Sequence, residues 1–244
     1  MRKPLHLVAA LALFLPLAGE TKQSLSIVHH FVETLRARVA EMEETKYQHR
    51  TAIDLEKGTY FCDCSGFLGF FLKKAFPESH ASLQGEEAPW RVRPLAVTFH
   101  ETFVRASEEK VPGWSRVRNF TEIIPGDLIA WRKDEVVRGE STGHVLLAIS
   151  TPVRDPDGRY HVRVLDSTSR PHADDTRGPD GNGVGEGTMW FSVDGNFEPA
   201  SYFVNEHSKP GKPKQIAVGR LTDRLIGISY GNPPVGPVEN ELNF

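Results

Sequence analysis

The order of local sequence patterns predicts an α+β fold, in which N-terminal helices pack on a central antiparallel sheet. Helical periodicity dominates the chain as far as about residue 107. From Ile123 onward, short apolar runs alternate with turn residues, which is typical of consecutive antiparallel strands. We find neither an internal repeat nor a second domain pattern, so we expect one domain to carry the fold.

The composition is that of an ordinary globular protein. The chain has 244 residues, of which 39% are hydrophobic and 25% are charged. The formal net charge is -3, and both signs are interspersed without a basic stripe or an arginine-rich arm. We therefore expect no nucleic-acid partner, and we expect a monomer.

Residues 1–19 have the features of a secretory signal peptide. Two basic residues precede an apolar run from position 7 to position 18, and polar residues follow. Cleavage after Gly19 fits best, and the run is too short to span a bilayer as a permanent helix. We expect a periplasmic or secreted protein with no integral membrane span after signal cleavage. An uncleaved N-terminal anchor is the alternative.

Three segments have a helical pattern: 24–44, 67–76 and 94–107. The second is apolar nearly all round and stops at Pro77, which predicts a buried helix with residues 63–65 at its N-terminus. The third begins with a proline, as many helices do. Residues 45–59 are polar and are expected to be irregular.

Strands are expected at 128–131, 144–150, 161–166, 189–193 and 200–204, with weaker candidates at 216–221 and 225–228. Between the third and fourth strands, residues 167–187 are polar and rich in glycine. The glycines at 181, 183, 185 and 187 suggest a flexible lid or turn. We expect the main domain to cover residues 20–205 and a partly irregular extension to cover residues 206–244.

The only two cysteines are Cys62 and Cys64. One residue apart on an extended chain, they are too far from each other for an unstrained disulfide, so at least one thiol is free. Cys64 lies at the N-terminus of the predicted buried helix, where backbone N–H groups and the helix dipole stabilise a thiolate. The same N–H groups can stabilise the oxyanion of an acyl-transfer reaction. Cys62 is expected to be a packed thiol, and redox control of Cys64 by Cys62 is the alternative.

A nucleophilic thiolate needs a base, and the base needs a third group that orients it. His144 begins a predicted strand directly after Gly143, and Asp166 ends the next strand. The sequence therefore predicts a catalytic triad of Cys64, His144 and Asp166. Whether the phase of the two strands brings His144 and Asp166 together is left open.

Three motifs in this order resemble the NlpC-type family of cell-wall cysteine peptidases: D-C-S-G-F at 63–67, P-G-D-L at 125–128 and G-H-V at 143–145. The resemblance covers roughly residues 47–167. It implies a papain-like fold and hydrolysis of amide bonds, often in peptidoglycan stem peptides. Asp166 then takes the third catalytic position, where the family normally has His, Asn or Gln.

The resemblance also bears on substrate contacts. The family usually has a tyrosine followed by paired glycines before the nucleophile; these glycines are missing here, and Tyr47 and Tyr60 compete for the tyrosine's place. Further candidate substrate contacts are motif residues Asp63 and Ser65, and loop residues His172 and Arg177. A guanidinium such as that of Arg177 suits a peptide carboxylate. The insertion at 84–118 suggests a subfamily with its own substrate.

No cofactor is expected, and no metal site either, because the C-x-C pair lacks a second pair of ligands at zinc spacing. The leading hypothesis is an exported hydrolase whose substrate is a peptidoglycan peptide or a similar amide. Acyl transfer by the same triad is one alternative. A non-catalytic cell-wall-binding module of the same fold is another, and a large separation of His144 from Cys64 would favour it.

Overall fold

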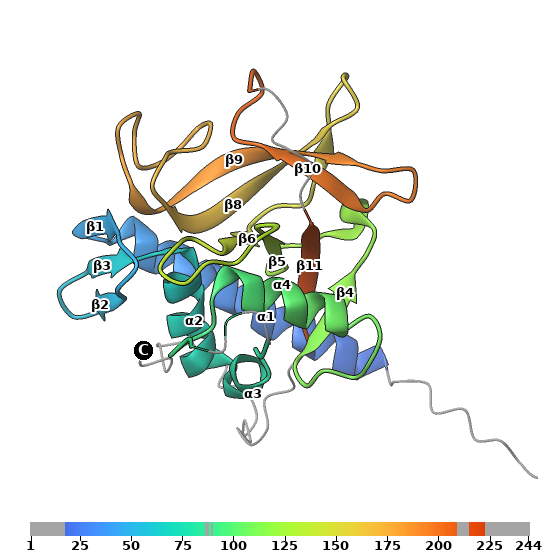
Figure 1. Cartoon of the computed structure of the whole chain (residues 1–244), viewed down its shortest axis with the longest axis horizontal. Helices are drawn as coiled ribbons and strands as arrows, with labels where there is room; N and C mark the ends of the chain where they lie inside the picture. Colours follow the sequence, from blue (N-terminus) through green and yellow to red (C-terminus); the bar gives the residue numbers. More distant parts are fainter. Residues whose placement is uncertain (1–17, 86–87, 89, 209–214, 223–244) are drawn as a thin grey trace, which may run out of the picture.

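The computed structural model describes residues 18–85, 88, 90–208 and 215–222. It confirms the α+β class, with a large antiparallel sheet and a few helices (Figure 1). The helices are α1 (Ala18–Ala40), α2 (Cys64–Ala75), α3 (Pro77–Ala81) and α4 (Ala96–Arg105), with a 3-10 turn at Phe120–Glu122. The strands are β1 (Glu44–Tyr47), β2 (Ala52–Asp54), β3 (Thr59–Cys62), β4 (Trp114–Val117), β5 (Leu128–Arg132), β6 (Gly143–Ala148), β7 (Val153–Arg154), β8 (Tyr160–Thr168), β9 (Gly183–Val193), β10 (Pro199–Phe203) and β11 (Ile216–Leu221).

The large sheet has the order β10-β9-β8-β6-β5-β11-β4, with β7 paired to β8. Every pair in it is antiparallel. A separate small sheet has the order β1-β3-β2, in which β3 runs parallel to β1 and antiparallel to β2. Because β3 leads directly into α2, the small sheet fixes where the first turn of α2 lies.

The large sheet is buried on both faces. On β5, Leu128 and Ala130 belong to the core that the helices share, whereas Ile129 and Trp131 belong to a second core on the other face. The second core is closed by curvature of the sheet itself, since the ring of Trp131 stacks on Tyr202 of β10 at 4.1 Å between centroids. A strand that is buried on both faces has a continuous apolar sequence, which is why β5 reads as one apolar run.

Helix α2 forms as predicted. Asp63 caps it by accepting a hydrogen bond from the Gly66 N–H at 2.7 Å, and the helix ends at Ala75, with Phe76 as its C-cap before Pro77. Its apolar residues are buried on several sides, against the sheet, α1 and the other helices. The N-terminus of α2 is therefore held rigidly at the end of the sheet where β6 begins.

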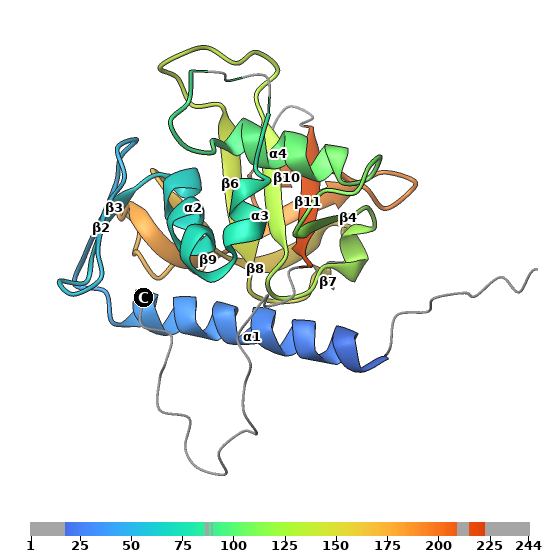
Figure 2. The same ribbon diagram turned by 90° about the horizontal axis from the view of Figure 1, so that it is seen from below.

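Helix α1 runs along one side of the molecule (Figure 2). The segment expected at 24–44 is helical from Ala18 to Ala40. Gly126, in the turn before β5, has φ of +101°, and a Cβ there would lie 2.1 Å from Cγ1 of Val28 on α1. The glycine thus permits both the turn and its close packing on the helix. The expected signal peptide, residues 1–19, lies outside the described residues except for its last two, which begin α1.

Two segments differ from the sequence-based expectation. Residues 45–59 are not irregular: they contain parts of β1, β2 and β3, which are short and only partly buried. Residues 167–187 do not form a flexible lid, because β9 begins at Gly183 and pairs with β8 over nine residue pairs, from Thr168 opposite Gly183 to Tyr160 opposite Phe191.

The extension expected from residue 206 contributes a strand to the domain. β11 lies inside the large sheet, between β5 and β4. The weaker strand candidate at 225–228 lies outside the described residues. No helix in the described part of the chain has the length and apolar character needed to cross a membrane.

Candidate active site

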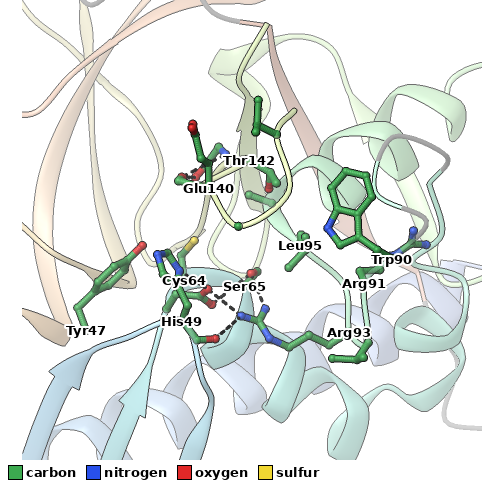
Figure 3. A pocket seen from close by; sticks show the side chains of 17 residues that line it. Tyr47, His49, Cys64, Ser65, Trp90, Arg91, Arg93, Leu95, Glu140 and Thr142 are labelled. Carbon is green, nitrogen blue, oxygen red and sulfur yellow. Dashed lines mark hydrogen bonds and ion pairs between the residues drawn. The ribbon is translucent and has the colours of Figure 1, made fainter. Parts of the chain in front are cut away.

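Cys64 is the first residue of α2 and borders a cavity of about 290 Å³ (Figure 3). The side chain is 4% exposed. Tyr47 and His49 lie on one side of the cavity, and Trp90 lies on the opposite side. A nucleophile at this position is accessible to a substrate from the cavity and is otherwise enclosed.

His144 is held in place at the start of β6. The preceding residue, Gly143, has φ of +144°, and a Cβ there would lie 2.0 Å from the carbonyl oxygen of Trp131 on β5. The His144 ring packs on the Trp131 ring, with 5.0 Å between centroids. Its Nε2 is 2.5 Å from Oδ2 of Asp166. A carboxylate accepts a hydrogen bond from Nε2, so Nδ1 is the nitrogen left for the Cys64 thiol.

The strand register explains why His144 and Asp166 meet. Leu147 of β6 pairs with Leu165 of β8. His144 is three residues from Leu147 and Asp166 is one residue from Leu165. Both offsets are odd, so both side chains point to the sheet face opposite to the two leucines. The sequence left open whether His144 and Asp166 lie on the same face of the sheet, and the structure shows that they do and that they are in contact.

The charges at the site are coupled. Burial disfavours protonation of His144, but the charge of Cys64 and side-chain hydrogen bonds with Asp166 and Cys64 outweigh burial and raise the pKa of His144 to about 10. Burial also disfavours ionisation of Asp166, but His172, His144 and Arg177 hold the pKa of Asp166 well below its ordinary value. The arrangement therefore favours an imidazolium at His144, between the Cys64 sulfur and the Asp166 carboxylate.

Cys62 has a different environment, although it is only two residues from Cys64. It is fully buried in β3 and forms no disulfide. Burial raises the pKa of the Cys62 thiol to about 12, so it remains protonated at neutral pH. It is a packed thiol, as predicted.

Asp63 and Ser65 form part of the cavity wall, where an arginine binds both. Arg93 donates from Nη2 to Oδ2 of Asp63 at 2.7 Å and from Nη1 to Oγ of Ser65 at 2.8 Å (Figure 3). His49 Nδ1 also lies 3.3 Å from Oδ2 of Asp63. Sequence reasoning missed Arg93 and His49, because neither belongs to a motif and Arg93 comes from the insertion at 84–118.

Of the two candidate tyrosines, only Tyr47 lies at the site. Burial and the neighbouring charges of Cys64, Asp63 and Asp166 raise the pKa of Tyr47, so its hydroxyl stays protonated and can donate a hydrogen bond. Tyr60 is 1% exposed and packs parallel to Phe71 in the core, 6.4 Å between centroids. The structure thus places Tyr60 away from the cavity.

A second cavity, of about 530 Å³, adjoins the first. His144 lines it, together with Trp131, Tyr202 and the basic residues Lys133 and Arg170. Four residues line both cavities: Tyr47, His49, Ser141 and Gly143. Cys64 therefore borders one half of a cleft, and His144 borders the other half.

The rim of this cleft is partly apolar. Among the described residues, six large hydrophobic side chains are exposed, and four of these line the two cavities: Trp90, Val92, Val137 and Val204. Exposed apolar side chains gathered around a cavity are typical of a binding site.

The two predicted substrate contacts in the loop after β8 have other partners. The Arg177 side chain is 1% exposed and pairs with Asp166 and Asp175, so it is not available for a substrate carboxylate. His172 lines the second cavity, but its side chain is 4% exposed and its Nε2 lies 3.0 Å from Oδ2 of Asp166. Both residues contact Asp166 instead.

The cluster of His144, Asp166 and His172 is also the place where a metal could bind, since one donor atom from each lies within 4.8 Å of the others. In the structure both imidazoles lie at hydrogen-bond distance from the same oxygen, and Arg177 occupies the other oxygen. The three side chains therefore form a hydrogen-bonded cluster.

Comparisons with protein-family models, with curated proteins and with solved structures find no match for this chain.

Proposed function

We propose that this protein is a cysteine hydrolase of the NlpC type, with a papain-like fold, that cleaves an amide bond. One observation carries the proposal: a cysteine at a helix N-terminus interacts with a histidine 80 positions away strongly enough to raise that histidine's pKa, and Nε2 of the same histidine lies 2.5 Å from a buried carboxylate. This is the arrangement that an activated nucleophile, a general acid–base and an orienting group require.

In the first half-reaction, the Cys64 thiolate attacks the amide carbonyl carbon and the carbonyl electron pair moves onto oxygen. The oxyanion is stabilised by backbone N–H groups of the first turn of α2. Asp63 already accepts from the N–H groups of Gly66 and Phe67, which leaves those of Cys64 and Ser65. The tetrahedral intermediate collapses, the C–N bond breaks, and the His144 imidazolium gives its proton to the leaving amine.

In the second half-reaction, water hydrolyses the thioester. Neutral His144 takes a proton from the water as its oxygen attacks the acyl carbon. The C–S bond then breaks, which releases the carboxylic acid and restores the thiolate beside the imidazolium. Asp166 accepts a hydrogen bond from Nε2 of His144 throughout and so keeps Nδ1 beside the sulfur, without itself being protonated.

We assign the two halves of the cleft from the positions of these two side chains. His144 gives its proton to the leaving amine, so the amine occupies the larger cavity, which His144 lines, and the acyl part occupies the smaller cavity, which Cys64 lines. The three motifs favour a peptidoglycan stem peptide or a similar amide as substrate. The basic run and apolar segment at residues 1–19 favour a periplasmic or secreted location.

The test is cleavage of peptidoglycan fragments, with new amino groups detected by mass spectrometry. The wild-type protein and Cys62→Ala should release the same product, and Cys64→Ala should release none. Absence of cleavage by the folded wild-type protein across a panel of stem peptides would count against the proposed substrate. Equal cleavage by Cys64→Ala would rule out the thiol mechanism.

Acyl transfer is the second candidate, because an acceptor amine could enter the same cavity that the leaving group vacates. Adding a free amine during turnover separates the two: a hydrolase gives only the acid, and a transferase gives the new amide. The contact between Cys64 and His144 counts against a non-catalytic binding protein.

A further inference from the structure

Residues 170–178, which we call the return segment, lie between β8 and β9 and fold back along β9. Ala173 forms a bridge with Thr188, and the Thr176 N–H donates to the carbonyl of Glu186 at 2.9 Å. The segment therefore runs beside β9 on the part of the strand that pairs with Asp166 and its neighbours.

Two glycines of β9 make this close packing possible. Gly185 is opposite Asp166 in the register with β8, and a Cβ on it would lie 2.5 Å from Cγ of Arg177. A Cβ on Gly187 would lie 2.7 Å from Cβ of His172. Real Cβ atoms do not approach other atoms so closely, so larger residues here would push the return segment away. The glycines that suggested a lid are the surface on which this segment rests.

The return segment brings two donors to one carboxylate. His172 Nε2 lies 3.0 Å from Oδ2 of Asp166, and Arg177 Nη2 lies 2.5 Å from Oδ1. Asp175 holds the two donors together, because it accepts from the His172 backbone N–H at 2.7 Å and from Arg177 Nη1 at 2.8 Å. Both oxygens of the Asp166 carboxylate thus accept a hydrogen bond from the return segment.

The sharing of Oδ2 is unusual, because His144 and His172 both place Nε2 on that oxygen. Nδ1 of His172 is buried and has no hydrogen-bond partner among the described residues. An unpaired buried ring nitrogen is costly, so a purely apolar residue would fill the same space at less cost. Packing alone therefore does not account for a histidine at this position.

We propose that His172 is a positioning residue for the Cys64–His144 pair, acting through Asp166. Together with Arg177 it fixes the plane of the buried carboxylate, so that Oδ2 stays on Nε2 of His144. The inference rests on the proposed function, in which the Asp166–His144 contact orients the base.

The consequence is electrostatic as well as geometric. The charged or titratable groups that face Asp166 are His144 from β6, His172 and Arg177 from the return segment, and Tyr47 from β1; Cys64 from α2 faces His144. If His172 is lost, Asp166 is free to turn away from His144. The pKa of His144, which is about 10 with this contact present, should then fall.

The experiment is an NMR titration of ring-labelled histidines in the full chain, with the His144 signal assigned from His144→Gln. In His172→Leu we expect the pKa of His144 to fall by about one unit or more. His172→Gln, which keeps an N–H donor near the Nε2 position, should recover part of that shift. An unchanged titration of His144, with only a lower melting temperature, would show that His172 is a packing residue and overturn the proposal. A rise of the pKa would show like-charge repulsion and overturn it too.

A second variant guards against failure of His172→Leu to fold. Gly187→Ala removes no titratable group from the chain but displaces His172 from Asp166, so it should also lower the pKa of His144. Gly195→Ala is the matched control, because a Cβ there meets nothing within 4 Å. A shift of His144 in both glycine variants, or in neither, contradicts the proposed role.

The titration is independent of any substrate, so it distinguishes this inference from the proposed function. If the wild-type protein cleaves no amide while His144 shifts in His172→Leu, the positioning role stands and the hydrolase fails. If a cleavable amide is found, His172→Leu should lower kcat about tenfold or more with little change in KM, because it disturbs the base and not the cleft.

Discussion

Two cysteines separated by one residue lie in different environments in this protein, and the backbone between them is the cause. Cys62 ends β3 with its side chain in the core, whereas Cys64 begins α2 beside His144. Asp63 makes the change of direction, because it is extended in backbone conformation and caps the helix. The D-C-S-G-F motif at 63–67 could therefore predict the position of Cys64 from the sequence, since the turn from strand to helix depends only on neighbouring residues.

The partners of these residues were only partly predictable. The structure brings His144 and Asp166 together from β6 and β8, near Cys64 at the start of α2. Strand alternation and turn residues were enough to place the last two on neighbouring strands. Arg93 and the link from His172 to Asp166 depend on how an insertion and a loop fold back. No periodicity or spacing in the sequence encodes such contacts.

At the residue scale, the raised pKa of His144 predicts the alkaline limit of activity. His144 must be protonated to donate to the leaving group, so kcat/KM should persist on the alkaline side until the pH approaches about 10. In Asp166→Asn that limit should move to lower pH, and kcat/KM at neutral pH should fall by roughly 10²–10⁴. A pH–rate profile of both proteins checks this, and an alkaline limit that does not move in Asp166→Asn would contradict it.

At the element scale, long two-sided strands were predictable and short polar ones were not. β5, β6 and β8 contain apolar runs from which the strands can be recognised in the sequence alone. β1 and β2 have only three or four residues each with no fully buried side chain, so their pairing with β3 is a tertiary effect. β3 itself alternates intermediate and buried side chains, which is a weak signal over four residues.

The capping of α2 gives the first element-scale prediction. Asp63→Ala removes the side-chain acceptor for the Gly66 N–H and the partner of Arg93, so the free energy of unfolding should fall by about 1–2 kcal/mol. Asp63→Asn keeps an acceptor for the helix and should cost less. Urea denaturation measures both, and equal losses would mean that capping is not the main contribution.

The junction of β5 and β6 gives the second element-scale prediction. Gly143→Ala places a Cβ 2.0 Å from the Trp131 carbonyl oxygen and forces a strained backbone, so His144 should be displaced and activity lost. Gly158→Ala is the control: Gly158 also has positive φ, at +88°, but a Cβ there meets only the end of the Arg154 side chain, at 4.0 Å. We expect Gly158→Ala to lose some stability but to keep its activity, and comparable activity in the two variants would contradict this account of β6.

At the scale of the whole molecule, the domain is completed by its C-terminal part. β11 contributes Val218 to one core and Ala217 to the other, between β5 and β4. The sequence showed only a weak strand there, because sheet order is set by pairing with strands almost a hundred residues away. A boundary placed at residue 205 therefore cuts through the sheet.

Truncation tests this directly. A chain that ends at Asn205 loses β11 and separates β4 from β5, so we expect it to lose its cooperative thermal transition and to be cleaved rapidly by proteases. A chain that ends at Thr222 keeps all of β11 and is the control, expected to keep the transition. Cooperative unfolding of the shorter chain would mean that β11 is dispensable.

The whole account depends on the charge pair between Cys64 and His144, and the rate of Cys64 alkylation by iodoacetamide as a function of pH tests it most directly. An ordinary thiol, with a pKa of about 8.5, reacts little at pH 6. With Cys62→Ala as the background, Cys64 should react rapidly at pH 6, and adding His144→Ala should abolish that reactivity until the pH rises toward 8.5. If Cys64 reacts with the same pH dependence whichever residue is at position 144, the pair does not exist and the hydrolase proposal is wrong.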